Sequence, residues 1–153
     1  MASWLEFETA APEFGAAGRR LLVGPDEVAI GFLASVSAHG APHLAPVCPI
    51  FCDADLYISA GSHTPKANDL RTSGHFVLHA LLAANDEEFQ IAGHARAVSD
   101  PAERTAVHSA IRFGAFKTTD PVFRLSIGRA LWVYWERVGQ PDTKPVVRRW
   151  AEQ

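Results

Sequence analysis

Alternating apolar and polar residues fill most of the chain from residue 28 onward, which is the pattern of β-strands with two different faces. In the first such segment, Phe32, Ala34 and Val36 share one face, and smaller residues occupy most of the other. Turn-forming residues separate the segments, as between the strands of an antiparallel sheet. The segments that we expect to form strands are 28–37, 43–51, 56–60, 75–82, 88–98, 123–127 and 131–135, with a short extended piece at 146–150.

Apolar residues at helical spacing interrupt this pattern. Phe14, Ala17 and Leu21 form an apolar stripe, and Pro25 is expected to follow the end of that helix. Asp100 is a suitable N-cap for the last helix, because proline occupies the next position. The predicted helices cover about 12–23, 66–72 and 101–111.

About seven strands with two or three helices between them predict one domain over residues 1–153. We expect an antiparallel barrel with peripheral helices, in the mainly β or α+β class. Pro42, Pro46 and Pro49 fall in the second strand, and proline lacks the amide that a central strand needs for pairing. This strand is therefore expected at an edge of the sheet or at a bulge. Its free backbone groups could serve a ligand, and a plain irregular edge is the alternative.

The composition excludes some classes of partner. A net charge of −3 with 20% charged residues offers no basic surface for nucleic acid. No apolar run is long enough to span a bilayer, and the first residues lack the regions of a secretory signal, so we expect a cytoplasmic protein. Cys48 and Cys52 are expected to be free thiols. They are four positions apart on a strand, which places them roughly 13 Å from each other, too far for a disulfide without a bend.

The segment Gly61-Ser62-His63-Thr64-Pro65-Lys66 carries the clearest binding chemistry. It ends a predicted strand and opens a helix, with Thr64 suited to the N-cap and Pro65 to the first helical position. The first-turn amides, the hydroxyls of Ser62 and Thr64, and Lys66 as the only cation can together form a seat for a phosphate. An ordinary capped helix with a solvated lysine is the alternative.

Signatures of other chemistry are absent from the sequence. Its seven histidines do not show the spacing of a zinc site, and His75 and His79 are separated by roughly 13 Å along a strand, so we expect no metal. The chain also lacks a nucleophile elbow, a dinucleotide-binding fingerprint and a P-loop.

A series of short motifs follows in a fixed order along the chain. They are His39-Gly40-Ala41-Pro42-His43, Pro46-Val47, Leu56-Tyr57-Ile58-Ser59, Thr64-Pro65-Lys66, Asn68-Asp69-Leu70-Arg71 and Gly93-His94-Ala95-Arg96-Ala97-Val98-Ser99-Asp100. Over residues 28–138 this ordered set resembles the pyridoxamine 5′-phosphate oxidase-like family of flavin-binding split β-barrels. The resemblance implies a homodimeric, flavin-dependent oxidoreductase that holds flavin mononucleotide (FMN) between its two subunits and acts on a small-molecule substrate that the sequence does not name.

The resemblance also assigns residues to the cofactor. One strand would flank the flavin ring, the next would contact the ribityl chain, the loop before the helix would hold the phosphate, and two later residues would approach the ring. In that order the assigned residues are His43, Leu44, Ala45, Pro46, Val47 and Cys48; Ile58 and Ser59; Ser62, Thr64 and Lys66; and Glu88 with Trp135, for which Trp150 is an alternative.

Two departures from the family pattern leave the cofactor open. His43 stands where the oxidase has a phosphate-binding arginine, and Glu88 stands where it has a glutamine. A deazaflavin coenzyme in the same groove is one alternative. A non-catalytic flavin or haem protein, with a histidine as axial ligand, and a cofactor-free barrel are others. No residue is assigned as a catalytic acid or base, although His43 and Glu88 are the polar candidates near the ring.

The last strands give a separate reason to expect a dimer. They are rich in aromatic residues, and a monomer that exposed several of them would carry an unusually large apolar patch. Pairing of two identical subunits would bury that patch. The aromatic residues concerned are Trp132, Tyr134, Trp135 and Trp150.

Overall fold

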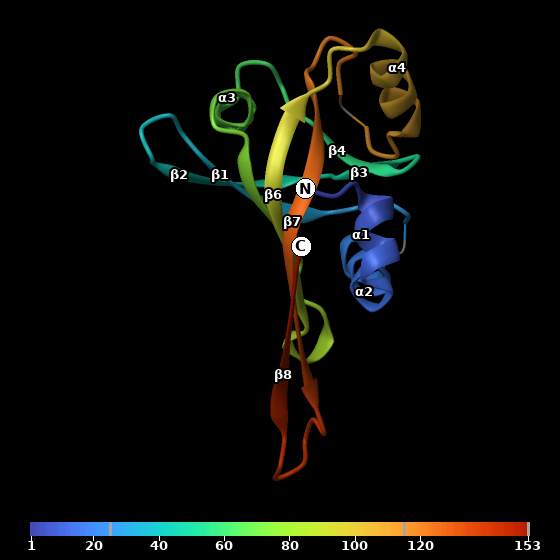
Figure 1. Cartoon of the computed structure of the whole chain (residues 1–153), viewed down its shortest axis with the longest axis vertical. Coiled ribbons are helices and arrows are strands. Elements are labelled where there is room, and N and C mark those ends of the chain that lie inside the picture. Colours follow the sequence, from blue (N-terminus) through green and yellow to red (C-terminus); the bar gives the residue numbers. More distant parts are fainter. Residues whose placement is uncertain (25, 115, 153) are drawn as a thin grey trace.

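One curved antiparallel sheet forms the body of the molecule (Figure 1). The computed structural model describes residues 1–24, 26–114 and 116–152, and within them the sheet has eight strands. The strands are β1 (Gly31–Val36), β2 (Pro42–Val47), β3 (Ile50–Cys52), β4 (Asp55–Ser59), β5 (His75–Ala80), β6 (Glu88–Ala97), β7 (Val122–Glu136) and β8 (Lys144–Ala151). Their order is β2-β1-β5-β6-β7-β4-β3, and β8 also pairs with β7.

The two ends of this sheet are close together in the chain. β2 and β3 stand at opposite ends of the strand order, yet only Cys48 and Pro49 connect them. Three consecutive Cα–Cα steps span at most about 11 Å, so the sheet must curl until its edges approach each other. The result is the split β-barrel, and the predicted fold class is confirmed. β2, which contains Pro42 and Pro46, is an edge strand as expected.

β7 is one strand of 15 residues where the sequence predicted two. Its first residues pair with β4 and its second half pairs with β8, while β6 pairs with its other side from Phe123 to Val133. The register with β6 shifts between Ala92 and Gly93 and passes over Gly128. A Cβ atom at Gly93 would lie 1.9 Å from the carbonyl oxygen of Ser126, so only glycine allows this close approach. Gly128 therefore marks a β-bulge and not a turn.

Four α-helices lie within the described residues: α1 (Trp4–Ala10), α2 (Pro12–Leu22), α3 (Pro65–Thr72) and α4 (Pro101–Ala110). A short 3₁₀ turn, η1 (Ala84–Asp86), precedes β6. The three predicted helices are confirmed, whereas the sequence analysis missed α1. Ser3 and Glu6 cap this helix reciprocally, each side chain bonding the other residue's backbone amide. Pro25, which the sequence places after α2, lies outside the described residues.

α1 and α2 cover one face of the sheet and build the main core with it. Trp150 of β8 packs edge-on against Phe7 with ring centroids 4.8 Å apart, and Trp132 of β7 packs against Phe14 at 6.1 Å. Both tryptophans are partly buried and pack against the core of their own chain, so they do not form a fully exposed patch. Trp135 is 39% exposed.

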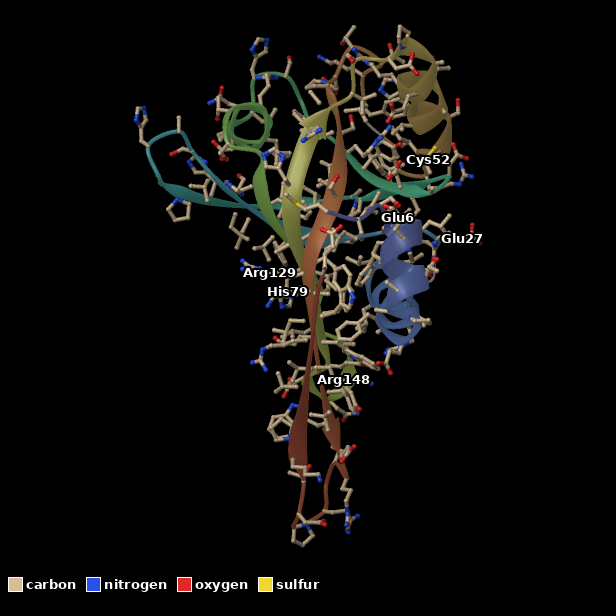
Figure 2. All side chains as sticks on the ribbon, in the orientation of Figure 1. Glu6, Glu27, Cys52, His79, Arg129 and Arg148 are labelled. Atoms are coloured by element: carbon tan, nitrogen blue, oxygen red, sulfur yellow. The ribbon has the colours of Figure 1, made fainter. Side chains whose placement is uncertain are left out.

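The opposite face of the sheet, which we call the bare face, carries apolar side chains that remain exposed. In β1 the larger side chains lie here: Phe32 is 40% exposed, whereas Leu33 faces the core and is 1% exposed. Figure 2 shows His79 and Arg129 on this side, away from α1. Because directly paired residues of an antiparallel sheet share a face, the strand register defines the members of the bare face. They include Phe32, Ala34, Val36, Leu44, Pro46, Val77, His79, Gln90, Ala92, Arg129, Leu131 and Arg149.

Two further expectations concern the cysteines and membranes. Cys48 and Cys52 are both free, as expected from their spacing. Among the described residues, no helix combines the length and the hydropathy needed to cross a lipid bilayer.

Candidate functional site

The loop from Gly61 to Thr64 and the first turn of α3 form the centre of the candidate site. Thr64 has extended backbone angles (φ −79°, ψ 149°), and its Oγ1 accepts a hydrogen bond from the Ala67 amide at 3.3 Å. The same hydroxyl donates to the Gly61 carbonyl at 2.8 Å and so closes the loop. Thr64 is therefore the N-cap that the sequence predicted, and its hydroxyl is committed to the fold.

Two cations flank this loop. Lys66 lies in the first turn of α3 and is half-buried. Arg71 lies in the last turn and reaches back, so that its Nη2 donates to the Ser62 carbonyl at 3.2 Å. The expectation that Lys66 is the only cation of the seat is therefore wrong. Eight helical residues rise only about 12 Å, so an arginine in the last turn remains near the start of the helix.

The residues of β2 point to two different faces. His43 and Ala45 are half-buried and Val47 is buried, all on the inward face. Leu44 and Pro46 are exposed on the bare face, where Leu44 is 70% exposed. The resemblance places this strand along the flavin ring, and of its side chains only the inward ones share a side with α3.

His43 is held in place by a buried carboxylate. Asp69 on α3 is 1% exposed, and its Oδ2 accepts a hydrogen bond from the Ser35 hydroxyl at 2.7 Å. The same oxygen lies 2.7 Å from Nδ1 of His43. Since a carboxylate accepts, we assign the hydrogen to Nδ1, which leaves Nε2 at the accessible end of the ring. This network joins β1, β2 and α3 and fixes the orientation of the imidazole.

Asp69 was not singled out as a site residue by the sequence reasoning. A charged residue between the buried side chains of Ala67 and Leu70 is unusual on the apolar side of a short helix. That position was the available signal, since a buried carboxylate requires hydrogen-bond partners. The partners themselves come from strands β1 and β2, which local sequence does not identify.

The other residues of the predicted groove differ in access. Ile58 is fully buried in the main core, so its side chain cannot contact a ribityl chain. Ser59, at the end of β4, is half-buried and stays accessible. Burial, together with the charge of Asp26, raises the pKa of the Cys48 thiol, so this group stays protonated at neutral pH.

Glu88 and Trp135 lie at the other end of the sheet. Glu88 begins β6, whereas Ala95 further along that strand bonds the carbonyl of Gly74, directly after α3. Seven strand residues span about 23 Å, so Glu88 cannot reach the seat within one chain. Trp135 lies in the β7–β8 ribbon, which extends away from α3 in Figure 1. A single chain therefore does not bring these two predicted residues to the phosphate seat.

A second group of titratable residues joins β4, β7 and α4. Glu103 accepts hydrogen bonds from the Tyr57 hydroxyl at 3.0 Å and from Arg124 at 2.6 Å. Asp55 lies 3.5 Å from the same guanidinium. Burial and the Glu103 hydrogen bond raise the pKa of Tyr57 far above its ordinary value. The members of this group satisfy one another, which is the behaviour of a structural cluster.

The histidines include one close pair. His75 and His94 face each other across β5 and β6, with ring centroids 5.5 Å apart. His75 also lines a cavity of about 560 Å³ on the outer side of the sheet, together with Val36 and Pro42. In the part of the chain that the structure describes, no three His, Cys, Asp or Glu residues form a group that could hold a metal ion.

No family model and no curated protein matches this sequence. Comparison with solved structures defines the class: the chain has the split-barrel fold of pyridoxamine 5′-phosphate oxidase-related, FMN-binding proteins. One such protein from Nostoc punctiforme matches with a TM-score of 0.58 and 11% identity, over 93% of this chain and 96% of its own. PhzG from Burkholderia lata 383, solved with tetrahydrophenazine-1-carboxylic acid, matches with a TM-score of 0.60 and 12% identity, over 94% and 92%.

A haem-binding protein from Mycobacterium smegmatis shares the fold as well. It matches 76% of this chain with a TM-score of 0.56 and 16% identity, and this chain spans 52% of its length. Identities at this level show a shared fold and transfer no ligand. The predicted resemblance is thus confirmed for the fold.

Proposed function

We propose that this chain binds the phosphate of FMN at the start of α3 and works as a homodimeric, flavin-dependent oxidoreductase. The observation that carries the proposal is the hydrogen bond from Arg71 to the Ser62 carbonyl, which holds a cation at the loop, with Lys66 in the adjoining first turn of α3. A phosphate dianion is stabilised both by such cations and by the positive end of a helix. FMN-binding proteins with the same fold support the proposal.

The residues of the chain would hold FMN in distinct ways. Lys66, Arg71 and the Ser62 hydroxyl would bind the phosphate, and the inward face of β2 would border the ring. His43 would present Nε2 to the groove, because Asp69 holds the other side of its imidazole. When bound, the flavin supplies the hydride chemistry.

The bare face supports the homodimer. Phe32, Val36 and Leu44 are exposed there on neighbouring strands. A monomer would leave this apolar surface in water, whereas an isologous contact buries it on both subunits. Such a dimer would also allow Glu88 and Trp135 of one subunit to approach the seat of the other, which a single chain cannot arrange.

Haem binding is the second candidate function. His75 lines a cavity of about 560 Å³, and His94 stands directly opposite on the next strand. Haem binding requires an axial ligand of this kind and a slot with apolar walls. A deazaflavin coenzyme is the alternative occupant of the α3 seat, because its anionic tail would use the same cations.

The visible absorption spectrum of the purified protein tests the proposal. It is recorded as isolated and during titration with FMN, a deazaflavin coenzyme and haemin. The proposal expects flavin bands and saturable uptake of FMN. A Soret band without uptake of FMN would support the haem candidate, tighter binding of the deazaflavin would replace FMN in the seat, and binding of none of the three would contradict a cofactor role.

A further inference from the structure

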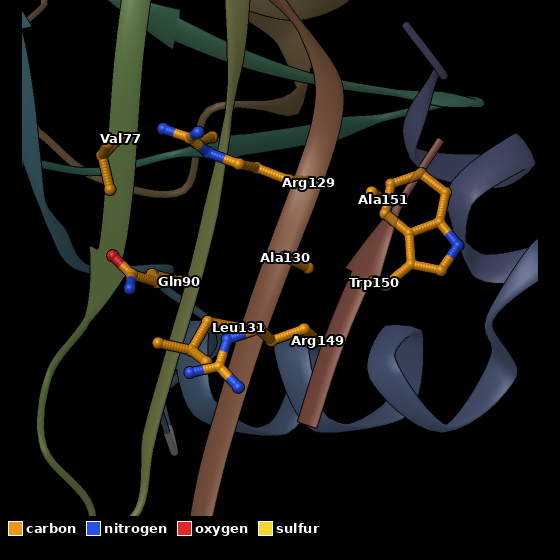
Figure 3. Close-up of a pocket in the computed structure, with 9 residues that line it drawn as sticks. Val77, Gln90, Arg129, Ala130, Leu131, Arg149, Trp150 and Ala151 are labelled. Atoms are coloured by element: carbon orange, nitrogen blue, oxygen red, sulfur yellow. The ribbon is translucent and has the colours of Figure 1, made fainter. Parts of the chain in front are cut away.

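The bare face contains a second cavity, of about 450 Å³, over strands β5 to β8 (Figure 3). Its floor is apolar, and three polar side chains rise from it. The floor consists of Val77, Ala92 and Leu131, and the polar residues are Gln90, Arg129 and Arg149.

The strand register brings the two arginines together. Arg149 pairs directly with Leu131, which is two residues from Arg129 along β7. Arg129 and Arg149 are therefore diagonal neighbours on one face, at a Cα separation of about 7–8 Å. Figure 3 shows both guanidinium groups on the same side of β7 as Gln90, while the ring of Trp150 points the other way. Both guanidinium groups can thus reach one small ligand.

The next feature is the charge of this arginine pair within the part of the chain that the structure describes. Among the described residues, neither Arg129 nor Arg149 has a carboxylate within ion-pair distance. Two nearby acids are engaged elsewhere: Glu88 lies 3.6 Å from His79 Nε2, and Glu152 lies 2.5 Å from the amino group of Met1. Neighbouring like charges destabilise a sheet. An anion bound between the two guanidinium groups would remove this electrostatic repulsion, which no described residue of the chain neutralises.

We propose that this cavity binds a small planar carboxylate, a site separate from the proposed flavin seat at α3. The carboxylate lies between Arg129 and Arg149, whose guanidinium groups match its geometry with paired donors. The Gln90 amide bonds the polar edge, and the ring rests on the apolar floor. The volume is in the range of small-molecule sites. Inorganic phosphate would interact only with the positive charge of the two arginines, and a neutral aromatic compound would contact only the apolar floor of the cavity.

Calorimetric titration of the full-length protein with 2-naphthoate, 2-naphthamide and inorganic phosphate tests this proposal. We expect 2-naphthoate to bind at least about tenfold more tightly than either of the others. Arg129→Gln and Arg149→Gln should each weaken 2-naphthoate about five- to tenfold, because the groups are partly solvated, and leave 2-naphthamide unchanged. Arg96→Gln is the matched control: this exposed arginine of β6 lies outside the cavity lining and should have no effect.

Several results would overturn the assignment. One is equal affinity for 2-naphthoate and 2-naphthamide, and another is an equal loss of 2-naphthoate affinity in the arginine variants and in the control. A third is no binding of 2-naphthoate at millimolar concentration, which would mean that a second copy of the chain covers the cavity. The titration is repeated at saturating FMN. Selective naphthoate binding by a protein that takes up no FMN would contradict only the flavin function, and FMN uptake without carboxylate selectivity would contradict only the cavity proposal.

Discussion

Replacement of Asp69 by alanine is expected to lower the free energy of unfolding by about 2 kcal/mol. The buried Ser35 hydroxyl would lose its partner at 2.7 Å, and an unsatisfied buried donor costs about 1–3 kcal/mol. The half-buried His43 ring would lose a second bond but could turn to water, which adds about 0.5 kcal/mol. The higher helix propensity of alanine offsets about 0.5 kcal/mol of this loss.

Urea unfolding followed by tryptophan fluorescence measures this change. All variants are compared at one protein concentration, because dimerisation would make the apparent stability depend on concentration. Asn68→Ala is the matched control on the same helix, since this exposed side chain makes no hydrogen bond or ion pair within the described residues and its loss should change stability by less than about 0.5 kcal/mol. Ser35→Ala removes the orphaned hydroxyl, so the double variant Ser35→Ala/Asp69→Ala should be more stable than the sum of the single losses by about 1 kcal/mol.

A loss below about 0.5 kcal/mol for Asp69→Ala would refute the reasoning. Strict additivity with Ser35→Ala would do the same, because it would mean that the two side chains do not share a hydrogen bond. Either result would also remove the support for an oriented His43 imidazole.

Lys66→Ala and Arg71→Ala should each weaken FMN binding about five- to tenfold in a fluorescence titration, since each removes a partly solvated phosphate contact, and leave riboflavin unchanged; equal losses for both ligands would place these cations away from the phosphate. Light scattering at low micromolar concentration should give twice the 16.6 kDa of the monomer, and Leu44→Asp should reduce the mass to that of the monomer; a native mass near 16.6 kDa would count against the dimer. Because the pKa of Tyr57 is raised, the folded protein keeps a proton that the unfolded chain releases above about pH 10, so stability should fall from about pH 10 to 11.5. Tyr57→Phe should flatten this dependence in urea unfolding, and an unchanged slope would contradict the assignment.

Strand periodicity in the sequence located most of the sheet, because alternation survives wherever two faces differ. It predicted residues 75–82 for the strand observed at His75–Ala80. It did not predict which face of β1 is buried, since period two shows only which residues share a side. Phe32 is larger than most residues of the opposite side, yet Leu33 faces the core, because α1 to α3 pack on that side. The sequence predicted separate strands at 123–127 and 131–135, whereas the register passes over Gly128 at a β-bulge and the strand continues.

The candidate site divides in the same way between local and long-range features. The cap at Thr64 was predictable, because its partners are within three residues. Asp69 was not, because its hydrogen-bond partners belong to other elements. Arg71 was missed because its partner, the Ser62 carbonyl, lies nine residues earlier in the loop outside the helix. The short helix α1 was missed because seven residues contain too few turns to show a helical period.

The central claim is that the loop before α3 recognises a phosphate. Equilibrium titration of the unaltered protein with FMN and with riboflavin tests it most directly, because the two ligands differ only in that group. The proposed site predicts that FMN binds at least about tenfold more tightly than riboflavin, as expected for charge-assisted contacts to Lys66 and Arg71. Equal affinity for the two flavins, or binding of neither, would contradict it.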